Sequence, residues 1–235
     1  MSHKSYALHH NEVHMKSNIL IFLMAFISFN AFAGVDEFPE NRNYTSADKG
    51  FAKYAAPSMK GSRKIVLTFD DGPSPTETPR LLDILAKYKA KATFFMLGES
   101  ITSQTLPIVE RMLREGHLIA AHSWDHDNSM SQSQDAFKQS LKKTIFTLDS
   151  ALKSANRTQN ETYFRFPYAA YGQHSGYHHL NAMREVSTQL FGDNCINFAF
   201  WSIDTTDWLG SMTPTDILQN VVANMDGGKA ITHKA

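Results

Sequence analysis

The chain has 235 residues, a length suited to one domain with short appendages. Its 23 lysine and arginine residues balance its 23 aspartate and glutamate residues, so the net charge indicates neither a nucleic-acid partner nor an anionic membrane surface. The single cysteine, Cys195, excludes an internal disulfide, and we expect it to be a small buried apolar residue.

Residues 1–33 have the pattern of an export signal. An apolar run occupies residues 19–29, Lys16 supplies a positive charge just before it, and Ala31-Phe-Ala33 matches a small-x-small cleavage site. The run is short for a membrane-spanning helix. We therefore predict export to the periplasm or the cell exterior, with no stable membrane anchor.

Residues 1–14 are interpreted as an over-extended start, because Met15 lies at the usual distance from such an apolar core. A histidine-rich tract can bind metal, but we leave the histidines of residues 1–14 out of the predicted site. They are His3, His9, His10 and His14.

The mature chain begins with residues 34–62, which show no clear period and are interpreted as an irregular arm. Short runs of β-branched and aromatic residues then predict strands at residues 64–69, 92–97, 118–121, 162–166, 197–203 and 229–232. Apolar residues at helical spacing predict a helix that opens at residue 78 and others at residues 106–115, 133–153, 178–190 and 215–224. This alternation predicts a parallel α/β architecture.

Polar residues follow the carboxyl ends of the predicted strands, which form the catalytic face of a (β/α) barrel. We therefore expect segments far apart in sequence to converge there. They are Asp70-Asp71, His122-Ser-Trp-Asp-His126, Arg165-Phe-Pro-Tyr168, Asp204-Thr-Thr-Asp207-Trp208 and His233.

The pair His122 and His126 predicts a metal site. On a helical turn this spacing places both imidazoles on one side. Two such histidines alone are more often surface residues, but here an aspartate turn and a further histidine accompany them. Two histidines and one carboxylate leave an open coordination position for catalysis and suit Zn²⁺, with Co²⁺, Mn²⁺ or Ni²⁺ as alternatives.

The adjacent carboxylates Asp70 and Asp71 are expected to have different tasks, because side chains alternate along a strand. One can ligate the metal while the other faces the substrate as a base. The tetrapeptide Asp70-Asp-Gly-Pro73 could also be an ordinary polar turn. The sequence contains no G-x-S-x-G elbow, which argues against a serine hydrolase of the α/β-hydrolase type. Walker A and G-x-G-x-x-G motifs are also absent.

Five segments resemble, in order and spacing, the motifs of the polysaccharide deacetylases (NodB-homology domain, carbohydrate esterase family 4). The resemblance covers about residues 63–235 and implies one catalytic domain, a distorted (β/α) barrel of about seven strands. In the family a further helix follows the last motif, whereas this sequence ends at Ala235, so we expect a fragment or a poorly covered last strand. The matching segments are residues 68–73, 122–126, 165–168, 204–208 and 231–233.

The resemblance also implies roles for individual residues. Asp71, His122 and His126 match the metal ligands. Asp70 matches the general base that deprotonates the attacking water, and Arg165 matches the residue that holds this base.

Further roles are implied around the substrate. The backbone N–H of Tyr168 matches the oxyanion donor, and His233 matches the general acid, with Asp207 as its charged partner. Trp208 and Ile231 match walls of the acetyl pocket. Together with Tyr168 they are the expected substrate-binding residues. His117, in a Gly-His pair that is also family-like, is implied to be a structural turn residue.

These features predict a metal-dependent deacetylase that hydrolyses the acetamide of N-acetylglucosamine units and releases acetate. The export signal favours peptidoglycan as the polymer. Chitin oligomers and, by O-deacetylation, acetylxylan are alternatives. A different hypothesis is an inactive wall-binding domain. We expect a monomer with a polysaccharide partner and no nucleic acid.

Overall fold

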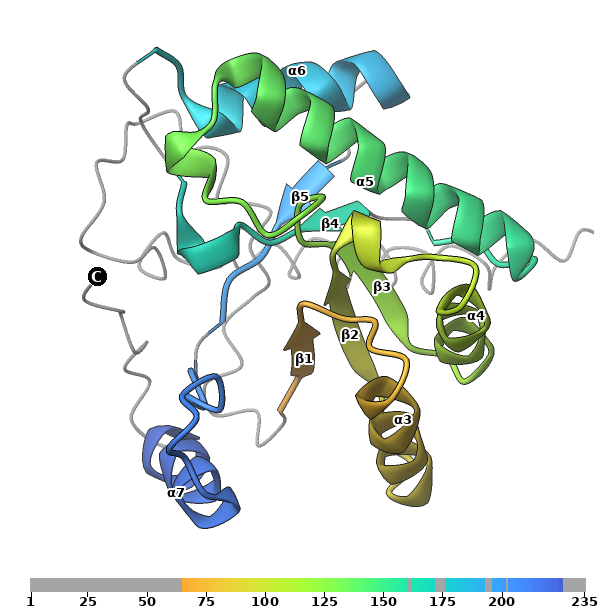
Figure 1. Cartoon of the computed structure of the whole chain (residues 1–235), viewed down its shortest axis with the longest axis vertical. Helices are drawn as coiled ribbons and strands as arrows, with labels where there is room; N and C mark the ends of the chain where they lie inside the picture. The colour runs from red at the N-terminus through yellow and green to blue at the C-terminus, as the bar shows by residue number, and fades with distance from the viewer. Residues whose placement is uncertain (1–64, 160–161, 172–175, 193–195, 202, 226–235) are drawn as a thin grey trace, which may run out of the picture. The chain divides into compact units, whose positions relative to one another are not determined.

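The computed structural model describes residues 65–159, 162–171, 176–192, 196–201 and 203–225 (Figure 1). Several predictions lie outside this part of the chain. They are the export signal, the arm at residues 34–62, the strand at residues 229–232, and the residues Cys195, Ile231 and His233.

The centre of the fold is a parallel sheet (Figure 1). In the described residues it contains β1 (Leu67–Asp70), β2 (Ala92–Met96), β3 (Leu118–Ala121), β4 (Thr162–Phe164) and β5 (Ile196–Phe198). The spatial order is the chain order, and every neighbouring pair is parallel. The predicted parallel α/β architecture is therefore confirmed, and the carboxyl ends of the strands share one edge.

The helices also lie close to their predicted positions. They are α3 (Glu77–Lys87), α4 (Leu106–Arg114), α5 (Gln134–Ser154), α6 (His179–Phe191) and α7 (Pro214–Met225), with 3₁₀ turns η3 (Gly98–Ser100), η4 (Ser129–Ser131) and η5 (Pro167–Ala169). No helix in the described ranges is long and apolar enough to cross a membrane.

The longest helix in the described part of the chain, α5, packs against β3, α4 and α6 (Figure 1). It starts where the Ser133 hydroxyl accepts a hydrogen bond from the N–H of Ala136, a common N-cap. Phe137, Leu141 and other apolar residues at helical spacing form its buried face. The ring of Phe137 stacks on Phe166, 5.8 Å between centroids, so the helix is fixed to the segment that follows β4.

Two strands end earlier than predicted. We expected β4 to reach residue 166 and β5 to reach residue 203, but they end at Phe164 and Phe198. The carbonyls of Ala199 and Phe200 accept hydrogen bonds from the Arg165 side chain. A carbonyl used in this way is less available to a strand ladder, so the site shortens the sheet locally.

Candidate metal centre

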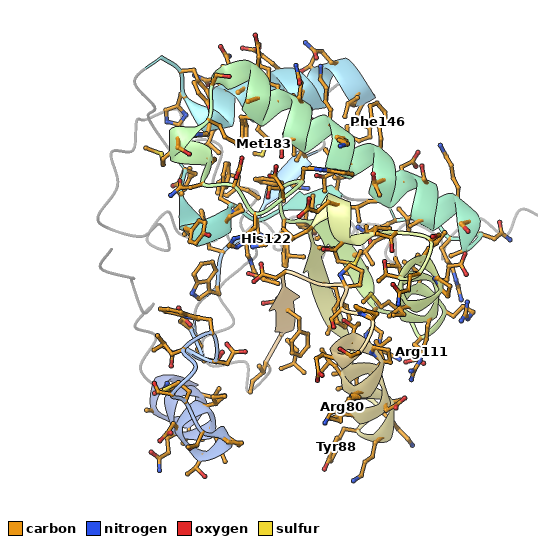
Figure 2. The ribbon with its side chains drawn as sticks, in the orientation of Figure 1. Arg80, Tyr88, Arg111, His122, Phe146 and Met183 are labelled. Carbon is orange, nitrogen blue, oxygen red and sulfur yellow. The ribbon has the colours of Figure 1, made fainter. Side chains whose placement is uncertain are left out.

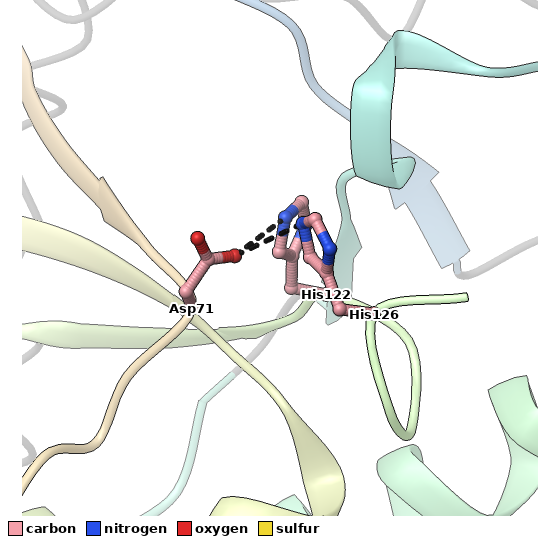
Figure 3. A group of neighbouring side chains, drawn as sticks. All are labelled: Asp71, His122 and His126. Atoms are coloured by element: carbon pink, nitrogen blue, oxygen red, sulfur yellow. Dashed lines mark ion pairs between the residues drawn. The ribbon is translucent and has the colours of Figure 1, made fainter. Parts of the chain in front are cut away.

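The three predicted metal ligands meet at the carboxyl edge of the sheet (Figure 3). Asp71 follows β1, while His122 and His126 follow β3. The Oδ1 atom of Asp71 lies 3.3 Å from Nε2 of His122 and 3.2 Å from Nε2 of His126. One ligand atom from each residue lies within 4.8 Å of the others, so the cluster has the donor set and spacing to hold a divalent metal ion.

The backbone at this cluster is strained. Asp71, Ser123 and His126 have φ angles of 71°, 71° and 62°, in the left-handed region that non-glycine residues seldom occupy. Our expectation of a helical turn between His122 and His126 was wrong, because the left-handed residues fold this segment into an irregular loop. Strain of this kind is typical of functional sites, where the surrounding structure maintains it.

Each histidine has a partner for its other ring nitrogen. Nδ1 of His122 lies 2.8 Å from the carbonyl oxygen of Arg165, and Nδ1 of His126 lies 3.0 Å from the hydroxyl of Tyr168. A carbonyl can only accept, so Nδ1 of His122 carries the proton and a neutral ring leaves Nε2 free for a metal. Both rings are therefore oriented toward Asp71.

The charge states suit metal binding. Interaction with His122 lowers the pKa of the Asp71 carboxyl below its usual range, although partial burial opposes the shift. Burial lowers the pKa of His126, against the attraction of Asp71. An ionised carboxylate and a neutral imidazole are the forms that bind a metal ion.

Asp70 belongs to a different network. Its Oδ1 accepts a hydrogen bond of 2.7 Å from Nη1 of the buried Arg165. The same guanidinium donates to the hydroxyl of Thr68 at 3.0 Å and to the carbonyls of Ala199 and Phe200 at 3.2 and 3.1 Å. Burial lowers the pKa of Arg165, and Asp70 opposes this shift. The other oxygen, Oδ2 of Asp70, lies 4.0 Å from Nε2 of His122 and faces the metal cluster.

The loop between the two histidines is held by η3 and α5. Gly98 N–H donates to the carbonyl of Ser123 at 3.0 Å, and Trp124 N–H donates to the Ser140 hydroxyl at 2.9 Å. Nζ of Lys143 lies 3.4 Å from the centroid of the Trp124 ring, in position for a cation–π interaction. Two neighbouring elements thus fix the loop that carries His126.

Three further predicted residues, Tyr168, Asp207 and Trp208, have exposed side chains. Tyr168 lies in η5 with a φ of 56° and an exposed side chain. Asp207 and Trp208 are exposed after β5, and Asp207 accepts a hydrogen bond of 2.6 Å from the Thr205 hydroxyl. Their parts in acid catalysis and in the acetyl pocket stay predictions, because His233 and Ile231 lie outside the described residues.

Sequence reasoning missed two contacts of the site, the Tyr168 hydroxyl on His126 and the Lys143 ammonium on Trp124. Trp124 lies in the motif of residues 122–126 and Tyr168 in the motif of residues 165–168, so their positions already indicated that both lie near the site. Lys143 is an exposed helix residue and has no local signature.

The fold and the site together define an α/β protein with a two-histidine, one-aspartate cluster beside a carboxylate that a buried arginine holds. The family model described as polysaccharide deacetylase matches residues 58–186, and the chain belongs to this family. The family predicted from the five motifs is therefore confirmed.

Individual relatives agree with this assignment. The peptidoglycan-N-acetylglucosamine deacetylase PgdA of Listeria monocytogenes is 37% identical over 155 residues, which are 65% of this chain and 28% of that protein. The structure of the peptidoglycan N-acetylglucosamine deacetylase Bc1960 is 30% identical with a TM-score of 0.62, covering 77% of this chain and 76% of that one. A family 4 acetyl xylan esterase from Clostridium thermocellum, in complex with a cobalt ion, is 28% identical with a TM-score of 0.54, and 67% of each chain is covered.

Proposed function

We propose that this chain is a metal-dependent deacetylase that hydrolyses the acetamide of N-acetylglucosamine units in peptidoglycan. The observation that carries the proposal is the pairing of the Asp71, His122 and His126 cluster with Asp70, whose Oδ2 faces that cluster. The names of PgdA and Bc1960 support peptidoglycan as the polymer. The chain spans 28% of the length of PgdA, and the rest of PgdA is not matched by this chain.

The metal ligands would be Asp71, His122 and His126, and zinc suits this donor set. A bound divalent ion supplies Lewis acidity, which makes water a better nucleophile at neutral pH and polarises the acetyl carbonyl. The related acetyl xylan esterase is in complex with a cobalt ion, which supports the proposal without deciding the ion.

Asp70 is proposed as the general base. The hydrogen bond from Arg165 holds Oδ1, which leaves Oδ2 on the side of the cluster to accept a proton from the attacking water. Because Arg165 is buried and makes three further hydrogen bonds, the orientation of Asp70 is set before substrate binds. Preorganisation of this kind is a major source of catalytic power.

The remaining steps are assigned by family resemblance. The backbone N–H of Tyr168 would stabilise the oxyanion, and one such donor contributes on the order of 3 kcal/mol. His233, charged with the help of Asp207, would protonate the leaving amine, and Trp208 and Ile231 would enclose the acetyl methyl group. Water adds to the carbonyl carbon, the C–N bond breaks, and the products are acetate and the free amine.

The location and assembly state are part of the same proposal. The predicted signal at residues 1–33 would deliver a monomeric catalytic domain, residues 63–235, to the periplasm or the cell exterior, where peptidoglycan lies. Detection of the protein in a periplasmic or medium fraction tests this, and retention inside the cell would contradict it.

The direct test is acetate release by the zinc-loaded protein from three polymers: peptidoglycan, N-acetylated chitin oligomers and acetylxylan. We expect release from peptidoglycan, and release from acetylxylan alone would overturn the amidase assignment. The Asp70→Asn variant should release no acetate while zinc still binds. Peptidoglycan binding without any acetate release would instead support the inactive wall-binding alternative.

A further inference from the structure

The side chain of Tyr168 makes a specific contact with a proposed metal ligand. Its hydroxyl lies 3.0 Å from Nδ1 of His126, and the two rings meet edge to face with centroids 4.6 Å apart. On the opposite side of the imidazole, Nε2 lies 3.2 Å from Oδ1 of Asp71. Each nitrogen of His126 therefore has its own neighbour.

Metal binding at Nε2 would require one form of the imidazole. A neutral histidine carries a single N–H, and Nε2 can bind a metal only if that proton is on Nδ1. Nδ1–H would then donate to the hydroxyl oxygen of Tyr168, which stabilises this tautomer and fixes the rotation of the ring. Partners of this kind are known to raise the affinity of histidine ligands for metal.

His122 has an equivalent contact of a different chemical type. Its Nδ1 lies 2.8 Å from the backbone carbonyl of Arg165, so no side-chain substitution removes that acceptor. Residues 165–168 thus provide the partner for both histidines. The contact to His126 depends on a side chain and can be deleted by itself.

The chain maintains Tyr168 in an unfavourable backbone conformation. Its φ of 56° is rare for a bulky residue. Buried Phe166 and Pro167 precede it, and the Ser129 hydroxyl donates to the carbonyl of Ala170 just after it. These flanking contacts hold the turn although the Tyr168 ring itself is exposed, so burial of the ring does not explain its position.

We propose that Tyr168 is a positioning residue whose side-chain hydroxyl accepts a hydrogen bond from Nδ1–H of His126 and so holds this ring in the orientation for metal binding. This inference rests on the proposed function only in requiring that Asp71, His122 and His126 bind a divalent ion. It is separate from the backbone role of Tyr168, since a substitution of the side chain leaves the N–H in place.

The test is the zinc affinity of Tyr168→Phe, measured by competition with a chromophoric chelator. Phenylalanine keeps the ring and the backbone N–H and removes only the hydroxyl. We expect zinc to bind about 10–100-fold more weakly, with an unchanged unfolding temperature of the metal-free protein. In the zinc-loaded wild type, NMR should detect a slowly exchanging Nδ1–H of His126, which the variant should lose.

The matched control is Tyr88→Phe, because Tyr88 is similarly exposed, at 70% against 61% for Tyr168, and lies at the end of α3 away from His122 (Figure 2). It should bind zinc as the wild type does. A Tyr168→Phe affinity within about twofold of wild type would overturn the proposal, as would a wild type that binds no zinc. Normal zinc binding without acetate release would count against the proposed function and not against the role of Tyr168.

Discussion

Asp70 and Asp71 are neighbours in sequence but face different partners. Asp70 is held by Arg165 at 2.7 Å, while Asp71 lies 3.3 and 3.2 Å from the two histidines. β1 ends at Asp70, and the left-handed backbone of Asp71 turns the second carboxylate toward the cluster. Substitutions at these two adjacent positions should therefore have separable effects.

Asp71→Asn should abolish the thermal stabilisation that zinc gives the wild type. A ligand that binds only the folded state adds about 2.7 kcal/mol of stability at a concentration of 100 times Kd. The neutral side-chain amide of asparagine lacks the negative charge with which Asp71 would attract the zinc ion. Unfolding temperatures measured over a zinc titration check this, and chelator should reverse the effect in the wild type. Asp70→Asn is the control and should keep the zinc response; an equal loss in both variants would contradict the division of roles.

The sequence predicted the parallel α/β fold, the helix positions and a site of His122, His126 and a carboxylate of the Asp70-Asp71 pair, because each depends on local patterns and on the shared edge of parallel strands. The choice of Asp71 as the ligand came from the family resemblance. It did not predict the loop of residues 122–126, since the positive φ values of Ser123 and His126 have no residue-type signature. The early end of β5 also escaped prediction, because it depends on hydrogen bonds from Arg165, more than thirty residues earlier in the chain.

Arg165→Lys should lower the rate of acetate release by about 10–100-fold, because orienting partners of a reacting group have effects of this size. A lysine has no planar fork and cannot bond Asp70 and both carbonyls together. The unsatisfied carbonyls of Ala199 and Phe200 should also reduce the free energy of unfolding by about 1–3 kcal/mol. Steady-state kinetics and urea denaturation provide the two measurements.

The control for this variant is Arg80→Lys. Arg80 is 75% exposed in its side chain and pairs with Glu77 at 2.9 Å on the surface of α3, where an ion pair contributes little (Figure 2). Both activity and stability should match the wild type. If Arg165→Lys behaved in the same way, the positioning of Asp70 by Arg165 would be refuted.

Gly98→Ala should destabilise the protein through the loop that carries His126. A Cβ atom at this position would lie 2.5 Å from Cε3 of Trp124 and 2.9 Å from Oγ1 of the buried Thr144. Overpacking of this kind typically costs about 1–3 kcal/mol. Displacement of Trp124 should also weaken zinc binding. Urea denaturation and the chelator competition measure the two effects.

Gly176→Ala serves as the control for the added methyl group, since no atom of the described residues lies within 4 Å of a Cβ at that position. Its unfolding free energy and zinc affinity should equal those of the wild type. A Gly98→Ala protein that is as stable as Gly176→Ala would show that the Trp124 ring moves without cost.

His117 should make the stability of the protein depend on pH in the weakly acidic range. Its ring is buried edge-on to Phe94, and Nδ1 accepts a hydrogen bond of 3.2 Å from the N–H of Ala92. Burial lowers the pKa of His117, helped by Lys91 and opposed by Glu115. This structural environment agrees with the turn role that the sequence indicated.

The sign of the effect follows from the lowered pKa. Above about pH 6.5 the His117 ring is neutral in both states and contributes no pH dependence. As the pH falls below that value, the unfolded chain binds a proton that the folded protein does not, so stability decreases by up to about 1.4 kcal/mol per pH unit until the folded pKa is reached. His117→Asn keeps an acceptor for Ala92 and cannot titrate. Urea denaturation between pH 7.5 and pH 5 should therefore give a steeper loss of unfolding free energy in the wild type than in His117→Asn, and parallel curves would exclude His117 as the cause.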